Sequence, residues 1–183
     1  MNKLTIALAS ILALSLYGCA SGAKFENMAY TESSGMSYDR ALKHEVKVKP
    51  VQGGEETNPL WTSEISAEAF QKAVEMSLSS QGLLSGSGRY KLKVILSKVD
   101  QPLFGLDLTV TTHVNYILVD TKTDKIIFDE EIVTPYTATF SDSAIAIKRL
   151  RLANEGSGKK NIEGLLKKLS AVNISKSNIS LTK

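Results

Sequence analysis

Two segments in the middle of the chain alternate apolar and polar residues with the period of two that is typical of β-strands. These segments are RYKLKVILSKV from Arg89 to Val99 and LDLTVTTHVNYIL from Leu106 to Leu118. The polar turn DTKTD follows, and KIIFDEEIV from Lys125 to Val133 is predicted to return as the last strand. An earlier segment, EVKVKPV from Glu45 to Val51, alternates in the same way and predicts a first strand. Its Pro50 favours a sheet edge or a strand end, because proline cannot donate a ladder hydrogen bond.

A helix is predicted between the first strand and the other three. Ser66 can cap its start and Gly82 can close its end. Ile65, just before the cap, and Phe70, four residues after it, can form a hydrophobic staple. The buried face then has the helical period: Phe70, Ala73, Val74, Ser77 and Leu78.

A second helical pattern runs from Ser143 to about Val172. Gly156 and Gly158 leave open a break into two helices, since each costs about 1 kcal/mol relative to alanine inside a helix. We favour one long helix, because small and polar residues continue its apolar stripe and would let it lie close against a sheet. These residues are Asn154, Ser157, Gly158 and Asn161.

The order of elements is therefore strand, helix, three strands, helix. Strands joined by hairpins, each with one polar face, indicate an antiparallel sheet. We expect an α+β fold, with an antiparallel sheet of about four strands and two helices packed on one face.

The start of the chain has the pattern of an export signal. Lys3 supplies a positive charge, and an apolar run of about 13 residues follows from Leu4 to Leu16. This run is too short for a transmembrane helix, which needs about 20 apolar residues.

The run ends in LYGC, which holds the only cysteine of the chain, Cys19. The motif resembles the lipobox of bacterial lipoproteins, with matches at Leu16, Gly18 and Cys19 and a bulkier Tyr17. The resemblance implies that Cys19 receives a diacylglycerol, that the signal is cut before it, and that the new amine is acylated. The alternative is a buried free thiol, with the leading segment serving as a core helix.

We accordingly divide the chain into a signal peptide at 1–18, a lipidated N-terminus and tether at 19–43, a periplasmic α+β domain at 44–172 and a polar tail at 173–183. The tether is predicted from its Ser, Gly, Asn and Lys content. Apolar residues make up 43% of the chain, which suffices for a core. A net charge of +3 is too small to indicate nucleic-acid binding.

No group of residues points to catalysis or to a metal or other cofactor. His44 and His113 are the only histidines, and we interpret both as surface residues. A hydrolase or transferase would need one of them beside a nucleophile in a pocket. Zinc or iron sites need three or four clustered ligands. Asp129, Glu130 and Glu131 would point to alternate faces of a strand, so they cannot converge.

Two apolar features are candidates for contact with a partner. The connection QPLFGL, from Gln101 to Leu106, carries Leu103 and Phe104 where a turn would normally be polar. Trp61 ends the loop GGEETNPLW beside a helix start. The alternative for the first is that its side chains fold back onto the core.

The overall layout resembles small lipoproteins of the Gram-negative envelope. It combines the lipobox, a helix ending in QGLL, the strand RYKLKVILSKVD, the hairpin TVTTHVNYILVDTKTDKIIFDEEIV and a closing helix. The resemblance includes the lipopolysaccharide-assembly lipoprotein and auxiliary lipoproteins of ABC-type transporters. It implies a non-enzymatic accessory or binding module that helps to assemble or stabilise an envelope machine.

The same resemblance sets the expected location and partners. Ala20 after the cysteine resembles outer-membrane sorting, which implies anchoring to the periplasmic face of the outer membrane. The expected partners are the membrane, through acyl chains such as palmitate on Cys19, and another envelope protein. A carrier of lipid or another apolar ligand is the alternative, and it would need a deep pocket between helices and sheet.

Overall fold

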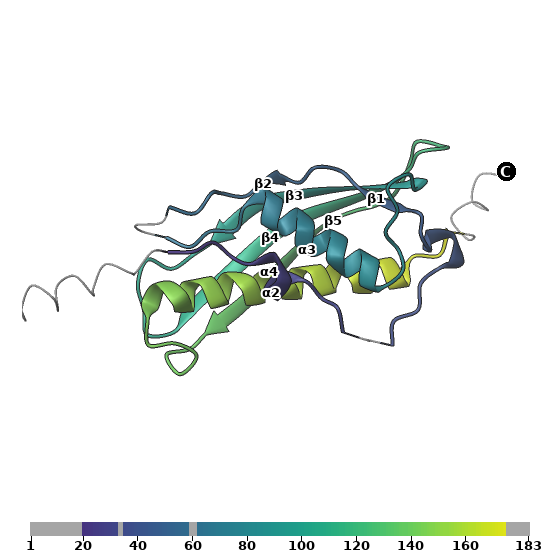
Figure 1. Ribbon diagram of the computed structural model, residues 1–183. Helices are drawn as coiled ribbons and strands as arrows, with labels where there is room; N and C mark the ends of the chain where they lie inside the picture. Colours follow the sequence, from purple (N-terminus) through teal and green to yellow (C-terminus); the bar gives the residue numbers. More distant parts are fainter. Residues whose placement is uncertain (1–19, 33–34, 59–61, 175–183) are drawn as a thin grey trace, which may run out of the picture.

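The computed structural model describes residues 20–32, 35–58 and 62–174. Its elements are α2 (Phe25–Met28), the 3-10 helix η2 (Arg40–Leu42), β1 (Val46–Val48), β2 (Gln52–Gly53), α3 (Ala67–Ser80), β3 (Tyr90–Asp100), β4 (Leu108–Asp120), β5 (Lys125–Ala138) and α4 (Ala146–Ala171). The helices α3 and α4 lie on one face of the sheet (Figure 1). The predicted α+β class is therefore confirmed.

The sheet is mixed rather than purely antiparallel. Its order is β1-β3-β4-β5, and β2 also pairs with β3. The long strands β3, β4 and β5 form antiparallel pairs, as predicted. Both β1 and β2 run parallel to β3. The reason is that α3 carries the chain across the sheet face and returns it in the same direction, as crossover helices do.

The predicted caps and staple of α3 are confirmed. The hydroxyl of Ser66 accepts a hydrogen bond from the backbone N of Ala69 at 3.2 Å. Ile65 and Phe70 are both fully buried. After the helix, Gly82 has a φ of 66°, a left-handed conformation that glycine adopts without strain.

The helix α4 is continuous over 26 residues, which confirms the preference for one helix. Its glycines lie where neighbouring elements come closest. A Cβ atom at Gly156 would lie 2.3 Å from the ring of Tyr136 on β5, and one at Gly158 would lie 2.8 Å from the sulfur of Met28. Their cost in helix propensity is offset by this close packing.

The core fills the space between the helices and the sheet. It includes Phe70 and Leu78 from α3, Tyr116 from β4, and Leu165 from α4, all with no exposed surface. The alternation predicted for β4 holds from Leu108 onwards, where every second residue is buried. The alternation does not extend back to Leu106, the first residue of the predicted segment, because it lies before the strand and is 75% exposed.

The segment predicted to be a tether is packed on the domain over its described residues. Met28 and Leu42 are fully buried, and α2 contacts both α3 and α4. Residues 20–32 and 35–43, within the segment predicted to be a tether, are therefore a packed part of the domain. Local composition missed this packing because the partners of these residues come from distant helices. The tail likewise begins in contact with the domain, since Ile174 is 4% exposed. Among the described helices, none combines the length and the apolar character needed to cross a membrane.

Candidate functional site

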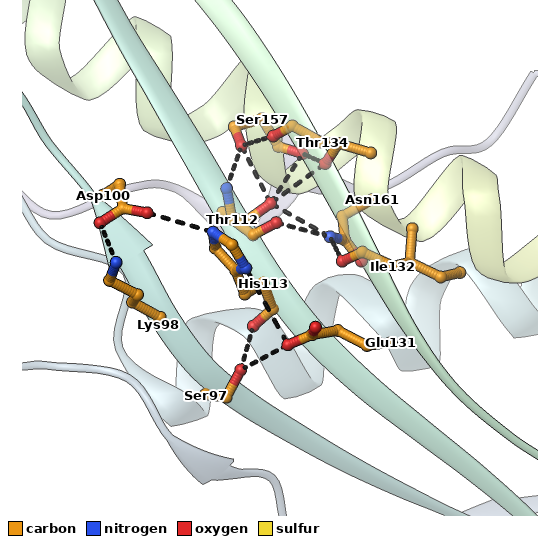
Figure 2. A network of polar contacts seen from close by, with 10 residues as sticks. All are labelled: Ser97, Lys98, Asp100, Thr112, His113, Glu131, Ile132, Thr134, Ser157 and Asn161. Atoms are coloured by element: carbon orange, nitrogen blue, oxygen red, sulfur yellow. Dashed lines mark hydrogen bonds and ion pairs between the residues drawn. The ribbon is translucent and has the colours of Figure 1, made fainter.

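The two histidines do not form a catalytic pair with a serine. His113 lies on the open face of β4, and its Nε2 is 3.1 Å from the carboxylate of Asp100 (Figure 2). Its Nδ1 is 3.9 Å from Oε1 of Glu131. Ser97 is nearby, but its hydroxyl donates to the backbone oxygen of His113 at 3.0 Å. His44 is exposed in a left-handed turn. This geometry gives no support to a hydrolase.

The cluster around His113 is an exposed set of ion pairs. Lys98 lies 2.7 Å from Asp100, whose pKa is lowered first by its hydrogen bond to Lys98 and then by that to His113. Both partners are about half exposed or more, so the pair contributes little to stability. The cluster is a solvated charged surface of the sheet.

On the opposite face of the same strand, a buried polar network joins α4 to the sheet (Figure 2). The hydroxyl of Ser157 donates to the backbone oxygen of Thr134 at 2.7 Å and accepts from the backbone N of Thr112 at 3.0 Å. One turn on, Asn161 donates to the backbone oxygen of Ile132 at 2.8 Å and accepts from the hydroxyl of Tyr116 at 2.9 Å. The network fixes the register of the helix on the sheet.

The most unusual surface of the domain is a group of exposed apolar side chains at one end. We define the apolar tip as Leu103, Phe104, Leu106, Phe140 and Ile145. The first three lie on the connection between β3 and β4, and the other two on the connection between β5 and α4. Leu103 is 97% exposed and Phe104 is 87% exposed. These side chains do not fold back onto the core.

Hydrogen bonds hold the two connections of the apolar tip together. Asp107 accepts from the backbone N of Phe140 at 3.0 Å. Arg149, on the first turn of α4, is only 3% exposed. Its guanidinium donates to the backbone oxygens of Gly105, at 3.1 Å, and Ser143. It also lies 5.6 Å from the centre of the Phe140 ring. The tip is therefore braced by a buried cation rather than left as two independent loops.

The described chain begins at the same end of the molecule. The backbone oxygen of Ser21 accepts from the hydroxyl of Ser63 at 2.8 Å. Ser63 is linked in turn to the start of the β3–β4 connection, because its backbone oxygen accepts from the side chain of Gln101 at 3.1 Å. Figure 1 shows both connections and the beginning of the described chain at the end where α4 starts.

The first residues are held on α4 by a buried carboxylate. Glu155 is 3% exposed and accepts from the backbone N of Lys24 at 3.0 Å and from the side chain of Asn27 at 2.8 Å. Arg151 lies 3.5 Å from the same carboxylate and donates to the hydroxyl of Ser21. The N-terminal segment is thus fixed from Ser21 to Asn27.

The structure describes two of the four predicted site residues. Cys19 and Trp61 lie outside the described residues. Leu103 and Phe104 are exposed, and their role in partner binding stays a prediction. The sequence reasoning missed Phe140, Ile145 and the bracing role of Arg149. A signal for Phe140 was available, since it is a bulky apolar residue in the polar stretch TFSDS.

Of three comparisons with known proteins, the one with solved structures gives matches, and these are bacterial proteins. No family model matches the chain. A sequence comparison with curated proteins gives no match. Among solved structures, a DUF330-family protein from Xanthomonas campestris aligns with a TM-score of 0.55 at 12% identity, over 79% of this chain and 94% of that one.

Two further solved structures have a similar fold. A hypothetical protein from Chlamydia trachomatis aligns with a TM-score of 0.54 at 9% identity, over 73% of this chain and 99% of that one. A minor lipoprotein from Acinetobacter baumannii aligns with a TM-score of 0.51 at 9% identity, over 70% and 92% of the two chains. At these identities the comparisons establish a shared fold, which extends over nearly the whole length of each of these structures.

Proposed function

We propose that the protein is a bacterial lipoprotein, anchored through acyl chains on Cys19, and that it serves the envelope as a non-enzymatic accessory module. The observation that carries the proposal is the lipobox-like LYGC placed directly before a folded domain. The shared fold with a minor lipoprotein from Acinetobacter baumannii supports it. Two or more acyl chains on one residue give stable anchoring, whereas a single chain binds reversibly.

The proposed location is the periplasmic face of the outer membrane, as implied by Ala20 after the cysteine. The resemblance in layout to the lipopolysaccharide-assembly lipoprotein and transporter auxiliary lipoproteins supports a role in envelope assembly or transport. Another envelope protein is the proposed partner. The assignment of Leu103, Phe104 and Trp61 to that contact remains a prediction.

Mass spectrometry of the membrane fraction tests the anchor. The mature protein is expected to begin at Cys19 and to carry the added mass of the acyl chains. A Cys19→Ser variant is the matched control and should lose both the added mass and the membrane association. Recovery of the unmodified chain as a soluble periplasmic protein with residues 1–18 attached would exclude the proposal.

The alternative of a lipid carrier has less support. The space between the helices and the sheet is occupied by core side chains such as Phe70, Tyr116 and Leu165. A surface hollow of about 560 Å³ beside α4 is open to solvent, and polar and charged residues form most of its lining. Tyr30, Glu155, Lys159 and Lys160 are among them. An apolar ligand bound there would lie beside these charged groups.

A further inference from the structure

The apolar tip lies at the end of the domain where the chain leaves the proposed lipid anchor. We propose that this tip docks on the bilayer, so that Leu103, Phe104 and their neighbours insert among the lipid headgroups. The inference rests on the proposed acylation of Cys19. It goes beyond anchoring, because it assigns a second, non-covalent membrane contact and an orientation to the domain.

The described chain is fixed on the domain from its first residues. Ala20 is 8% exposed, and Ser21 is fixed by Ser63 and Arg151. Consecutive Cα atoms are about 3.8 Å apart, so the peptide that joins the proposed acylation site to Ala20 spans no more than that distance. Acyl chains on Cys19 can enter a bilayer only if this end of the domain is at the membrane surface.

The side chains of the apolar tip have the chemistry of membrane-inserting residues. Its members are leucine, isoleucine and phenylalanine, which partition into membranes, and they stand on two turns that project from the sheet. The charges beside them have both signs: Asp107 and Asp142 against Lys148 and Arg149. This balance favours apolar insertion into zwitterionic lipid over attraction to an anionic surface. Acylation raises the local concentration of lipid at the tip, so a few side chains suffice for contact.

The fold holds the apolar tip rigidly. The guanidinium of Arg149 braces both connections from beneath. A small separate core supports them, formed by Leu108, Val110, Ala138, Leu150 and Ala153. The fold thus holds apolar side chains outward, where their exposure to water is unfavourable. A bilayer at this end removes that exposure.

Docking orients the whole domain. The tip lies at the start of α4, whose 26 residues extend away from it for about 39 Å at 1.5 Å per residue. The turn between β4 and β5, with Lys122, lies at the opposite end (Figure 1). This turn would face the periplasm and be available to a partner.

A site-specific probe in the full acylated chain tests the docking. Leu103→Cys and Lys122→Cys are labelled with an environment-sensitive fluorophore, since acylation blocks the thiol of Cys19. Both positions are exposed, so neither change should disturb folding. The proteins are placed in vesicles of phosphatidylcholine and phosphatidylethanolamine, with and without brominated acyl chains. The probe at 103 should shift to the blue and be quenched by bromine, whereas the probe at 122 should do neither.

The outcomes separate docking from anchoring. A chain that floats with the vesicles while its probe at 103 still reports water refutes docking and leaves the anchor intact. A shift at 103 that requires added envelope proteins also refutes docking and assigns the tip to a protein partner. A chain that fails to float refutes the anchor, and the docking with it.

Discussion

The ring of Tyr136 on β5 packs directly against Gly156 of α4. A Cβ atom at residue 156 would lie only 2.3 Å from Cδ1 and 2.4 Å from Cε1 of that ring. This contact explains why a residue that disfavours helix stands in the middle of the longest helix. It also lets the sheet and helix approach closely enough for the buried hydrogen bonds of Ser157 and Asn161 to form.

Gly156→Ala should therefore destabilise the protein even though alanine favours helix by about 1 kcal/mol. Overpacking of this kind costs about 1–3 kcal/mol, because the ring of Tyr136 must move. Chemical denaturation measures the change. In the double variant with Tyr136→Ala, the alanine at 156 should no longer be unfavourable. Gly164→Ala is the control in the same helix: a Cβ atom there would lie 3.0 Å from Cγ2 of Ile132, so its effect should be smaller.

The pair of Asn161 and Tyr116 should show strong energetic coupling. Asn161→Ala leaves the hydroxyl of Tyr116 and the backbone oxygen of Ile132 without their partner, which should cost about 1–3 kcal/mol for each buried group. Burial raises the pKa of Tyr116 well above its usual range, so the hydroxyl stays protonated and still needs an acceptor. Tyr116→Phe in the Asn161→Ala background should cost less than it does alone. Equal costs in both backgrounds would contradict the coupling.

Asp120 should make the free energy of unfolding depend on pH. The hydrogen bond from Arg89 lowers the pKa of this buried carboxyl from 3.8 to about 2. A depressed folded-state pKa means that the stabilisation is complete above pH 4 and is lost as the pH falls from 4 towards 2. Between these values the native protein should lose stability more steeply than Asp120→Asn. The free energy of unfolding, measured across this range, checks the difference.

Removal of the Glu155 carboxylate should release the first residues without unfolding the domain. Glu155→Ala deletes the acceptor for the backbone N of Lys24 and the side chain of Asn27. Hydrogen exchange at residue 24 should accelerate, while exchange in β4 stays slow. Glu163→Ala is the matched control, since that carboxylate pairs with Lys167 on the helix surface. Equal acceleration in both variants would show that Glu155 is not the clamp.

The apolar tip should contribute little to the stability of the fold. Leu103 and Phe104 are almost wholly exposed, so Leu103→Ser with Phe104→Ser should change the free energy of unfolding by no more than about 0.5 kcal/mol for each residue. Denaturation of the protein in the absence of membrane measures this. A large loss would mean that these side chains pack on the core.

Regular patterns in the sequence predicted the elements that build the scaffold. Alternation located β3 and β4, because each of these strands has one buried face. The polar turn DTKTD located β5, which follows it. The caps at Ser66 and Gly82 located α3. The parallel pairing of β1 was missed, although the order strand, helix, strand is the arrangement that a crossover produces.

The rest of the site depends on contacts between residues far apart in the chain. Serine and glycine between residues 20 and 43 indicated a tether, but Met28 packs under Gly158 and Lys24 bonds to Glu155. No local pattern records such partners. Likewise, the exposure of Phe140 follows from where two connections meet, which the period of neither strand reveals.

The clamp on the first residues also has a consequence for biosynthesis. Ser21 contacts Arg151, a residue 130 positions later in the chain. Chains fold as they emerge from the N-terminus, so this docking surface does not exist until most of the polypeptide has been exported. In the proposed lipoprotein, processing at Cys19 can therefore precede this docking. Completion of α4 is then the step that fixes the segment beginning at Ser21 on the folded domain.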